Sequence, residues 1–202
     1  MIGAGASNSM DIDAEKAALR KQLKVLRNGL PEGDRAEWSK QICSNVEKYC
    51  VSKRIRKVAA FWPLGSEVDL RPLVSSQPGW VFVFPRVVST HPPRLSWGPE
   101  PLEPGLFGLM EPVMAQHFFP PAQLLLVPGL GFNDDGFRIG YGGGFYDALL
   151  DRAGDGLITL GVAYEAQMVP ELPIGPLDQP AQGVVTERGI RWVMDQGLDI
   201  RD

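Results

Sequence analysis

Apolar side chains in the N-terminal part of the chain recur at helical spacing, which predicts two consecutive helices. The first stripe has intervals of four, three and four residues and consists of Leu19, Leu23, Leu26 and Leu30. It predicts a helix over 13–30 with Asp13 as its N-cap. The second stripe consists of Trp38, Ile42, Val46 and Tyr49. It predicts a helix that follows a capping box at Asp34 and Glu37 and stops near Ser52.

Farther along the chain, short apolar runs of the kind found in buried strands replace the helical stripes. These runs predict strands over 57–62, 80–84, 95–97, 124–127 and 157–163, and a closing hairpin over 184–186 and 191–193. A short helix over 70–75 lies between the first two strands, and this strand–helix–strand order favours parallel pairing. The segment 98–121 carries six prolines and predicts a long irregular loop. The pattern therefore predicts an α/β fold with two N-terminal helices and a central, mostly parallel sheet flanked by helices.

The length and composition of the chain predict a single globular domain. The chain has 202 residues, of which 44% are hydrophobic and 22% charged, as in ordinary soluble proteins. We expect residues 11–202 to form the domain and residues 1–10 to be a flexible tail or a cloning remnant, with Met10 as a possible natural start. A net charge of −4 argues against nucleic-acid binding. No apolar run approaches the ~20 residues that span a bilayer, so we expect no membrane association.

Cysteine usage indicates a reduced, cytoplasmic protein. Cys43 and Cys50 are the only cysteines. On one helix they would lie ~10 Å apart along the axis, which is too far for a disulfide. Two cysteines and two scattered histidines also make a zinc site improbable. Nothing in the sequence sets the oligomeric state, and a monomer is compatible with it.

The strongest chemical signal is a glycine-rich segment between a predicted strand and a predicted helix. Four of the five positions in 140–144 are glycine. Glycine lets the backbone approach an anion, and the following helix presents its positive end. Arg138 adds a fixed cation, and Asp147 adds an oxygen that could hold Mg²⁺ beside phosphates. The alternative is a mobile turn. The spacing matches neither a P-loop nor a dinucleotide fingerprint.

Four other groups of polar residues have two interpretations each. Lys16 and Arg20 share one helical face, which is either solvated or holds an anion. Trp62 and Glu67 follow the first strand, where they could contact a heterocycle, although Ser66 could instead cap a short helix that begins with Glu67.

Asp178 is either a turn former or a second metal ligand. Glu165 and Gln167 are either loop residues, which we favour, or polar groups at a pocket mouth.

These residues lie in a pattern that closely resembles the 5-formyltetrahydrofolate cyclo-ligase family. The central match is Val127-Pro-Gly-Leu-Gly-Phe followed by Gly136-Phe-Arg-Ile-Gly-Tyr-Gly-Gly-Gly-Phe-Tyr-Asp147. Similar motifs stand at Lys16-Ala-Ala-Leu-Arg20 with Arg27, Trp62-Pro-Leu-Gly-Ser-Glu67-Val-Asp69, Phe84-Pro-Arg86, Gly105-Leu-Phe-Gly-Leu-Met-Glu-Pro112, 161–167 and 172–187. The resemblance covers roughly residues 14 to 188.

The resemblance implies an ATP- and Mg²⁺-dependent ring closure of 5-formyltetrahydrofolate to 5,10-methenyltetrahydrofolate, with release of ADP and phosphate through a phosphorylated formyl (iminophosphate) intermediate. It implies that Lys16 and Arg138 are catalytic and that Trp62, Glu67 and Arg20 bind the folate. Asp147 and Asp178 would hold Mg²⁺. The residues implied to bind ATP are Lys16, Arg20, Arg138, Ile139, Gly140, Tyr141, Gly142, Gly143, Gly144, Phe145 and Tyr146.

Two rival functions remain open at this point. One is a folate- or nucleotide-binding relative without turnover, against which the joint presence of Glu67, Arg138, Asp147 and Asp178 speaks. The other is a generic binder of sugar phosphates, which would give no role to Lys16, Arg20 or Glu67. A test for ADP release that depends on 5-formyltetrahydrofolate separates the cyclo-ligase from both rivals.

Overall fold

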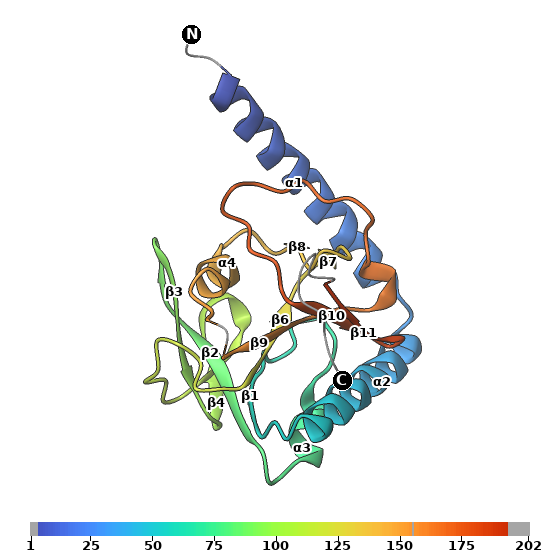
Figure 1. Cartoon of the computed structure of the whole chain (residues 1–202), viewed down its shortest axis with the longest axis vertical. Coiled ribbons are helices and arrows are strands. Elements are labelled where there is room, and N and C mark those ends of the chain that lie inside the picture. The colour runs from blue at the N-terminus through green and yellow to red at the C-terminus, as the bar shows by residue number, and fades with distance from the viewer. Residues whose placement is uncertain (1–3, 155, 194–202) are drawn as a thin grey trace.

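The computed structural model describes residues 4–154 and 156–193, with side chains from residue 11 onward, as one α/β layer structure (Figure 1). Its central sheet has seven strands in the order β11-β10-β9-β6-β1-β2-β3. These strands are β1 (Lys57–Ala59), β2 (Val81–Thr90), β3 (Pro93–Gly98), β6 (Leu124–Pro128), β9 (Ile158–Val162), β10 (Gly183–Thr186) and β11 (Gly189–Trp192). The inner strands pair in parallel, and only the edge strands β3 and β11 are antiparallel. The predicted mostly parallel sheet is therefore confirmed.

Helices cover both faces of this sheet. Those on the faces are α2 (Glu32–Ser52), α3 (Arg71–Ser76) and α4 (Phe145–Leu150). Helix α1 (Ala4–Gly29) instead packs against η2 (Glu165–Gln167), one of two 3₁₀ turns, the other being η1 (Leu106–Gly108). In Figure 1, α2 and α3 lie on one side of the sheet and α4 lies on the other. No helix in the described ranges is both long enough and apolar enough to cross a bilayer.

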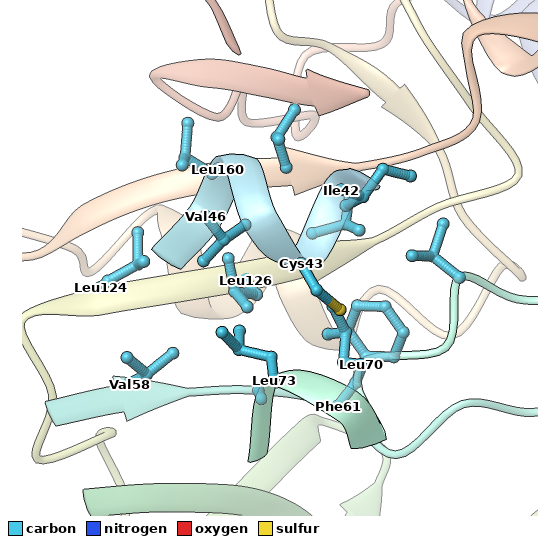
Figure 2. Packing of buried hydrophobic residues seen from close by; sticks show 14 of the residues in the cluster. Ile42, Cys43, Val46, Val58, Phe61, Leu70, Leu73, Leu124, Leu126 and Leu160 are labelled. Carbon is cyan, nitrogen blue, oxygen red and sulfur yellow. The ribbon is translucent and has the colours of Figure 1, made fainter. Parts of the chain in front are cut away.

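Strand β6 shows why the chain forms a two-sided layer. Its four residues from Leu124 to Val127 are all fully buried, which is typical of a strand covered on both faces. Leu124 and Leu126 pack with side chains of α2 and α3 in the larger core, as Figure 2 shows for Ile42, Val46 and Leu73. Leu125 and Val127 point to the opposite face, where Leu149 and Leu150 of α4 meet them.

The two N-terminal helices exist as predicted, but their starts differ. Helix α1 begins at Ala4, so Asp13 lies inside it and is not its N-cap; residues 1–3 lie outside the described residues. Helix α2 has Pro31 at its N-cap position without a side-chain cap, so the capping box at Asp34 and Glu37 is wrong. Proline sets a helical φ at this boundary without a polar cap. The stripe of α2 is confirmed, since Ile42 and Val46 are buried and Trp38 and Tyr49 pack beside them.

The stripe of α1 is only partly confirmed. Leu23 is buried against Leu130 and Ile139, and Leu19 and Leu30 are half-buried in the cores. Leu26, however, is 40% exposed, while Arg27 beside it is only 3% exposed. The part of this helix that meets the protein therefore includes a buried cation.

The proline-rich segment 98–121 is more ordered than predicted. It contains a short antiparallel hairpin, β4 (Leu102–Pro104) and β5 (Met110–Pro112). The hairpin is held to β2 because Arg86 donates to the carbonyl of Pro112 and pairs with Glu103, while the Val87 N–H donates to the Glu111 carboxylate. Proline prevents neither strand here, because both belong to a two-stranded sheet in which few backbone donors are needed.

The two cysteines are free, as their helical spacing predicts, and both are buried. Burial raises the pKa of the Cys43 thiol to about 11 and that of the Cys50 thiol to about 12. We expect neither thiol to react with a disulfide reagent such as DTNB at pH 8 in the folded protein, and both to react in guanidinium. Rapid reaction of either thiol without denaturant would contradict this packing.

Candidate active site

A large cavity opens beyond the carboxyl ends of β1 and β6. Its volume is about 1040 Å³, which is ample for two small ligands. Each of the residues that the sequence singled out for ATP, folate or Mg²⁺ lines it: Lys16, Arg20, Trp62, Glu67, Arg138, Ile139, Gly140, Tyr141, Gly142, Gly143, Gly144, Phe145, Tyr146, Asp147 and Asp178. These residues come from α1, the loop after β1, the glycine-rich loop and a C-terminal loop. The fold thus brings the sequence-predicted residues together, while their individual roles stay predictions.

The glycine-rich loop forms one wall of the cavity and is open to it. It joins β8 (Arg138–Ile139), the second strand of a hairpin with β7 (Gly131–Phe132), to α4. Gly142 has a φ of +98° and Gly144 a φ of +67°, values that favour glycine. Residues 141–144 are exposed. The loop is therefore available to a ligand and is not packed against the core.

Helix α1 meets this loop, although nothing in its spacing alone required it. The Arg20 Nε–H donates to the carbonyl of Gly140 at 3.1 Å. Lys16, one turn earlier, forms an ion pair with Asp178 of the C-terminal loop. The Asp178 carboxylate also accepts the N–H of Gly175 at 2.7 Å. The solvated-face interpretation of Lys16 and Arg20 is thus wrong, because both side chains are half-buried at the cavity.

Arg138 and Asp147 form a second pair beneath the loop. The Arg138 Nη2 donates to the Asp147 Oδ1 at 2.9 Å, and its Nη1 donates to the carbonyl of Gln179, also at 2.9 Å. Burial lowers the pKa of Arg138, while the charge of Asp147 opposes this shift. The ion pair with Asp147 favours the charged form of this guanidinium. The site therefore holds two cation–carboxylate pairs.

Glu67 is a buried lining residue that contacts the glycine-rich loop through Tyr141. Its Oε2 accepts the Leu64 N–H at 2.9 Å, and its Oε1 accepts the Tyr141 hydroxyl at 2.8 Å. Burial raises the pKa of Glu67, and these two hydrogen bonds and the charge of Arg27 oppose the rise. The alternative in which Ser66 caps a helix beginning at Glu67 is wrong, because α3 starts at Arg71 with Leu70 at its N-cap.

The rest of the lining near Glu67 is largely apolar. Trp62 contacts the ring of Phe84 edge-on, with ring centroids 5.8 Å apart. Other apolar lining residues, which the sequence did not single out, are Phe61, Pro85, Val87, Pro93, Leu95, Phe107, Leu109 and Met110. An apolar wall with one carboxylate suits a flat heterocycle that carries N–H donors.

The two carboxylates near the glycine-rich loop, Asp147 and Asp178, have the chemistry to hold a magnesium ion. In the part of the chain that the structure describes, no three His, Cys, Asp or Glu side chains form a metal cluster. Asp147 and Asp178 line the same cavity, and both contribute to the field at Arg138. Mg²⁺ usually takes one or two carboxylates and completes its shell with waters and substrate phosphates. The donor set therefore fits an ion that arrives with a nucleotide.

Two other candidates lie elsewhere, and one buried residue was missed. Gln167 is buried and donates to the carbonyls of Gly129 and Leu130, while Glu165 pairs with Arg191; neither lines the cavity. The favoured interpretation of both as structural residues is confirmed.

Arg27, which pairs with Glu67 from behind, was not predicted as part of the site. Its spacing of seven residues from Arg20 places it on the same helical face and was the available signal.

Known proteins share both the sequence pattern and the fold. The model of the 5-formyltetrahydrofolate cyclo-ligase family matches residues 12–187. A 5-formyltetrahydrofolate cyclo-ligase of Mycolicibacterium smegmatis is 29% identical over 187 residues, which cover 87% of this chain and 95% of that protein. The corresponding mouse enzyme is 23% identical and covers 89% of this chain and 97% of its own length.

A solved structure agrees with these relatives. The NMR structure of 5,10-methenyltetrahydrofolate synthetase from Aquifex aeolicus is 33% identical, covers 93% of this chain and 96% of its own, and has a TM-score of 0.78. A synthetase structure from Mycoplasma pneumoniae, at 23% identity and a TM-score of 0.70, supports the same fold. The chain therefore belongs to the 5-formyltetrahydrofolate cyclo-ligase family of ligases.

Proposed function

We propose that this chain closes the ring of 5-formyltetrahydrofolate to 5,10-methenyltetrahydrofolate at the expense of Mg²⁺-ATP, releasing ADP and phosphate. One observation carries the proposal: a single cavity is lined both by the glycine-rich loop with Arg138 and Lys16 and by Glu67 and apolar side chains. The first group suits a polyphosphate and the second a pterin. Two ligands that react with each other need such an arrangement.

The chemistry needs positioning and charge, and no protein nucleophile. The formyl oxygen attacks the γ-phosphorus, and the bond to ADP breaks. N10 then attacks the formyl carbon, its proton leaves, and the carbon–oxygen bond breaks to release phosphate. Arg138 and Lys16 offset the negative charge that spreads over the transferred phosphoryl group. Phosphorylation turns the formyl oxygen into a good leaving group, which is why ring closure consumes a nucleotide.

Other residues bind and orient the two substrates. The loop from Ile139 to Tyr146 wraps the phosphates, with Arg20 bound to Gly140 between the nucleotide and the folate. Trp62 and Glu67 receive the pterin. Asp147 and Asp178 would hold a magnesium ion, which would supply positive charge to offset that of the phosphates. The ion pairs of these carboxylates with Arg138 and Lys16 keep the four side chains in place before the nucleotide arrives.

An absorbance assay for the conjugated methenyl product, run beside an ADP assay, tests this proposal. We expect product and ADP in equal amounts when protein, ATP, Mg²⁺ and 5-formyltetrahydrofolate are all present. Leaving out any one component should stop both signals. Binding of folate or nucleotide without product would favour a relative that has lost turnover. ADP release without folate would contradict the proposed reaction.

A further inference from the structure

Arg27 is a buried cation directly behind Glu67 and outside the lining of the cavity. Its residue is only 3% exposed. Its Nε donates to the Ser66 hydroxyl at 3.0 Å, and its Nη2 donates to the Tyr141 hydroxyl at 2.7 Å. Its Nη1 lies 3.7 Å from the Glu67 Oε1 and has no hydrogen-bond partner among the described residues. Burying a guanidinium is costly unless a charge compensates it, and Glu67 is that charge.

Tyr141 connects the same pair to the glycine-rich loop. Its hydroxyl accepts from Arg27 and donates to the Glu67 Oε1, so the three side chains form a closed triangle. Arg27 also faces the Tyr141 ring, 5.7 Å from its centroid. Because Tyr141 stands between Gly140 and Gly142, the triangle joins helix α1, the loop after β1 and the phosphate-side loop.

Among the described residues, Arg27 is the only cation that pairs with Glu67. Tyr141 and the Leu64 N–H donate to its two oxygens, and the Tyr146 hydroxyl lies in its field. Asp69, two residues on, pairs with Arg71. Burial alone pushes Glu67 toward its neutral form, and the hydrogen bonds from the Leu64 N–H and Tyr141, together with the charge of Arg27, act against this.

We propose that Arg27 is a positioning residue that keeps Glu67 anionic and correctly oriented, so that this carboxylate can accept hydrogen bonds from the ring nitrogens of the folate. The inference rests on the proposed function. An ionised carboxylate offers acceptors only, whereas a protonated one would present a hydroxyl donor to donors of the pterin. Arg27 acts through Glu67 and touches no substrate.

Kinetics of Arg27→Met and Arg27→Lys, measured as a function of pH, test the proposal. The readouts are KM for folate, KM for ATP, and the acidic limb of the pH profile of kcat/KM for folate. Lys24→Met is the matched control, because Lys24 is an exposed cation one turn earlier on the same helix. Circular dichroism and thermal unfolding establish that each variant is folded.

Arg27→Met should raise KM for folate about tenfold or more, with a much smaller effect on KM for ATP. Its acidic limb should move up by about one pH unit or more, because an opposite charge at such a distance lowers a carboxyl pKa by roughly 1–3 units. Arg27→Lys should keep the acidic limb close to its position in the parent protein, since it keeps the positive charge. Lys24→Met should behave as the parent protein.

A double variant separates positioning from general damage. In a Glu67→Gln background nothing at this position can ionise, so adding Arg27→Met should move the pH profile no further. An unchanged acidic limb in folded Arg27→Met, or an equal shift in both backgrounds, would overturn the proposal.

If neither Arg27 variant folds, Tyr141→Phe provides the test. This variant removes one donor to Glu67 and should shift the acidic limb in the same direction. No shift would overturn the proposal. Failure of the proposed function would be distinct, since the parent protein itself would then form no methenyl product.

Discussion

Replacing Arg138 by alanine is expected to lower kcat/KM for Mg²⁺-ATP by roughly 100- to 1000-fold, the usual effect of losing one donor to a transition-state charge. Arg138 lines the cavity beside the glycine-rich loop, and its side chain is only 4% exposed, so its charge is weakly screened. KM for 5-formyltetrahydrofolate should change little, because we propose that Glu67, and not Arg138, binds the folate. Steady-state kinetics with each substrate varied in turn measure both effects.

Two controls make the result interpretable. Arg138→Ala also leaves the Gln179 carbonyl without its donor and Asp147 with only the Gln179 N–H, so thermal unfolding must show that the variant is folded at the assay temperature. Arg152→Ala removes an exposed cation just after α4 and should leave the kinetics unchanged. A folded Arg138→Ala variant with normal ATP kinetics would remove Arg138 from the proposed site.

Replacing Asp147 by asparagine is expected to weaken binding of the metal–nucleotide complex by about 100-fold or more, since even residues that only support metal ligands commonly contribute 10- to 100-fold. The substitution keeps the shape and an oxygen acceptor toward Arg138 but removes the charge that a hard cation needs. Titration with Mn²⁺ in the presence of ADP, followed by electron paramagnetic resonance, measures this directly and without turnover.

Asp134→Asn provides the matched control for Asp147→Asn. Asp134 is an exposed carboxylate in the turn between β7 and β8, so its loss changes the net charge by the same amount. We expect Mn²⁺ affinity to be unchanged in this variant. Equal Mn²⁺ affinity in the parent protein and Asp147→Asn would contradict the assignment of Asp147 as a metal ligand.

The sequence predicted those helices and strands that a local pattern of apolar residues identifies. It did not predict features that depend on contacts with residues far away in the chain. The apolar run at β6 identified a central strand because all four side chains must leave water on both faces. The hairpin β4–β5 was missed, because its prolines indicate a loop and the Arg86 and Glu111 contacts that hold it come from remote pairing. Likewise, the start of α1 could not be inferred from Asp13, which only offers a cap.

The site residues also differ in how far the sequence predicts them. The glycine-rich loop can be identified from a short stretch of sequence, since four glycines, Arg138 and Asp147 lie within ten residues. Lys16 and Arg20 required either the resemblance or the fold, because helical spacing cannot reveal which loop a helix face meets. Arg27 was the hardest case: a cation beside a leucine stripe is normally solvated, and only the packing of α1 against Glu67 and Tyr141 buries it.

If one cavity holds Mg²⁺-ATP against the formyl group, the phosphoryl group passes directly to the formyl oxygen. Turnover of 5-formyltetrahydrofolate labelled with oxygen-18 in the formyl group, followed by phosphorus NMR of the released phosphate, detects this transfer. We expect one oxygen-18 atom in each phosphate released. Unlabelled phosphate, with the methenyl product formed at the normal rate, would contradict direct transfer.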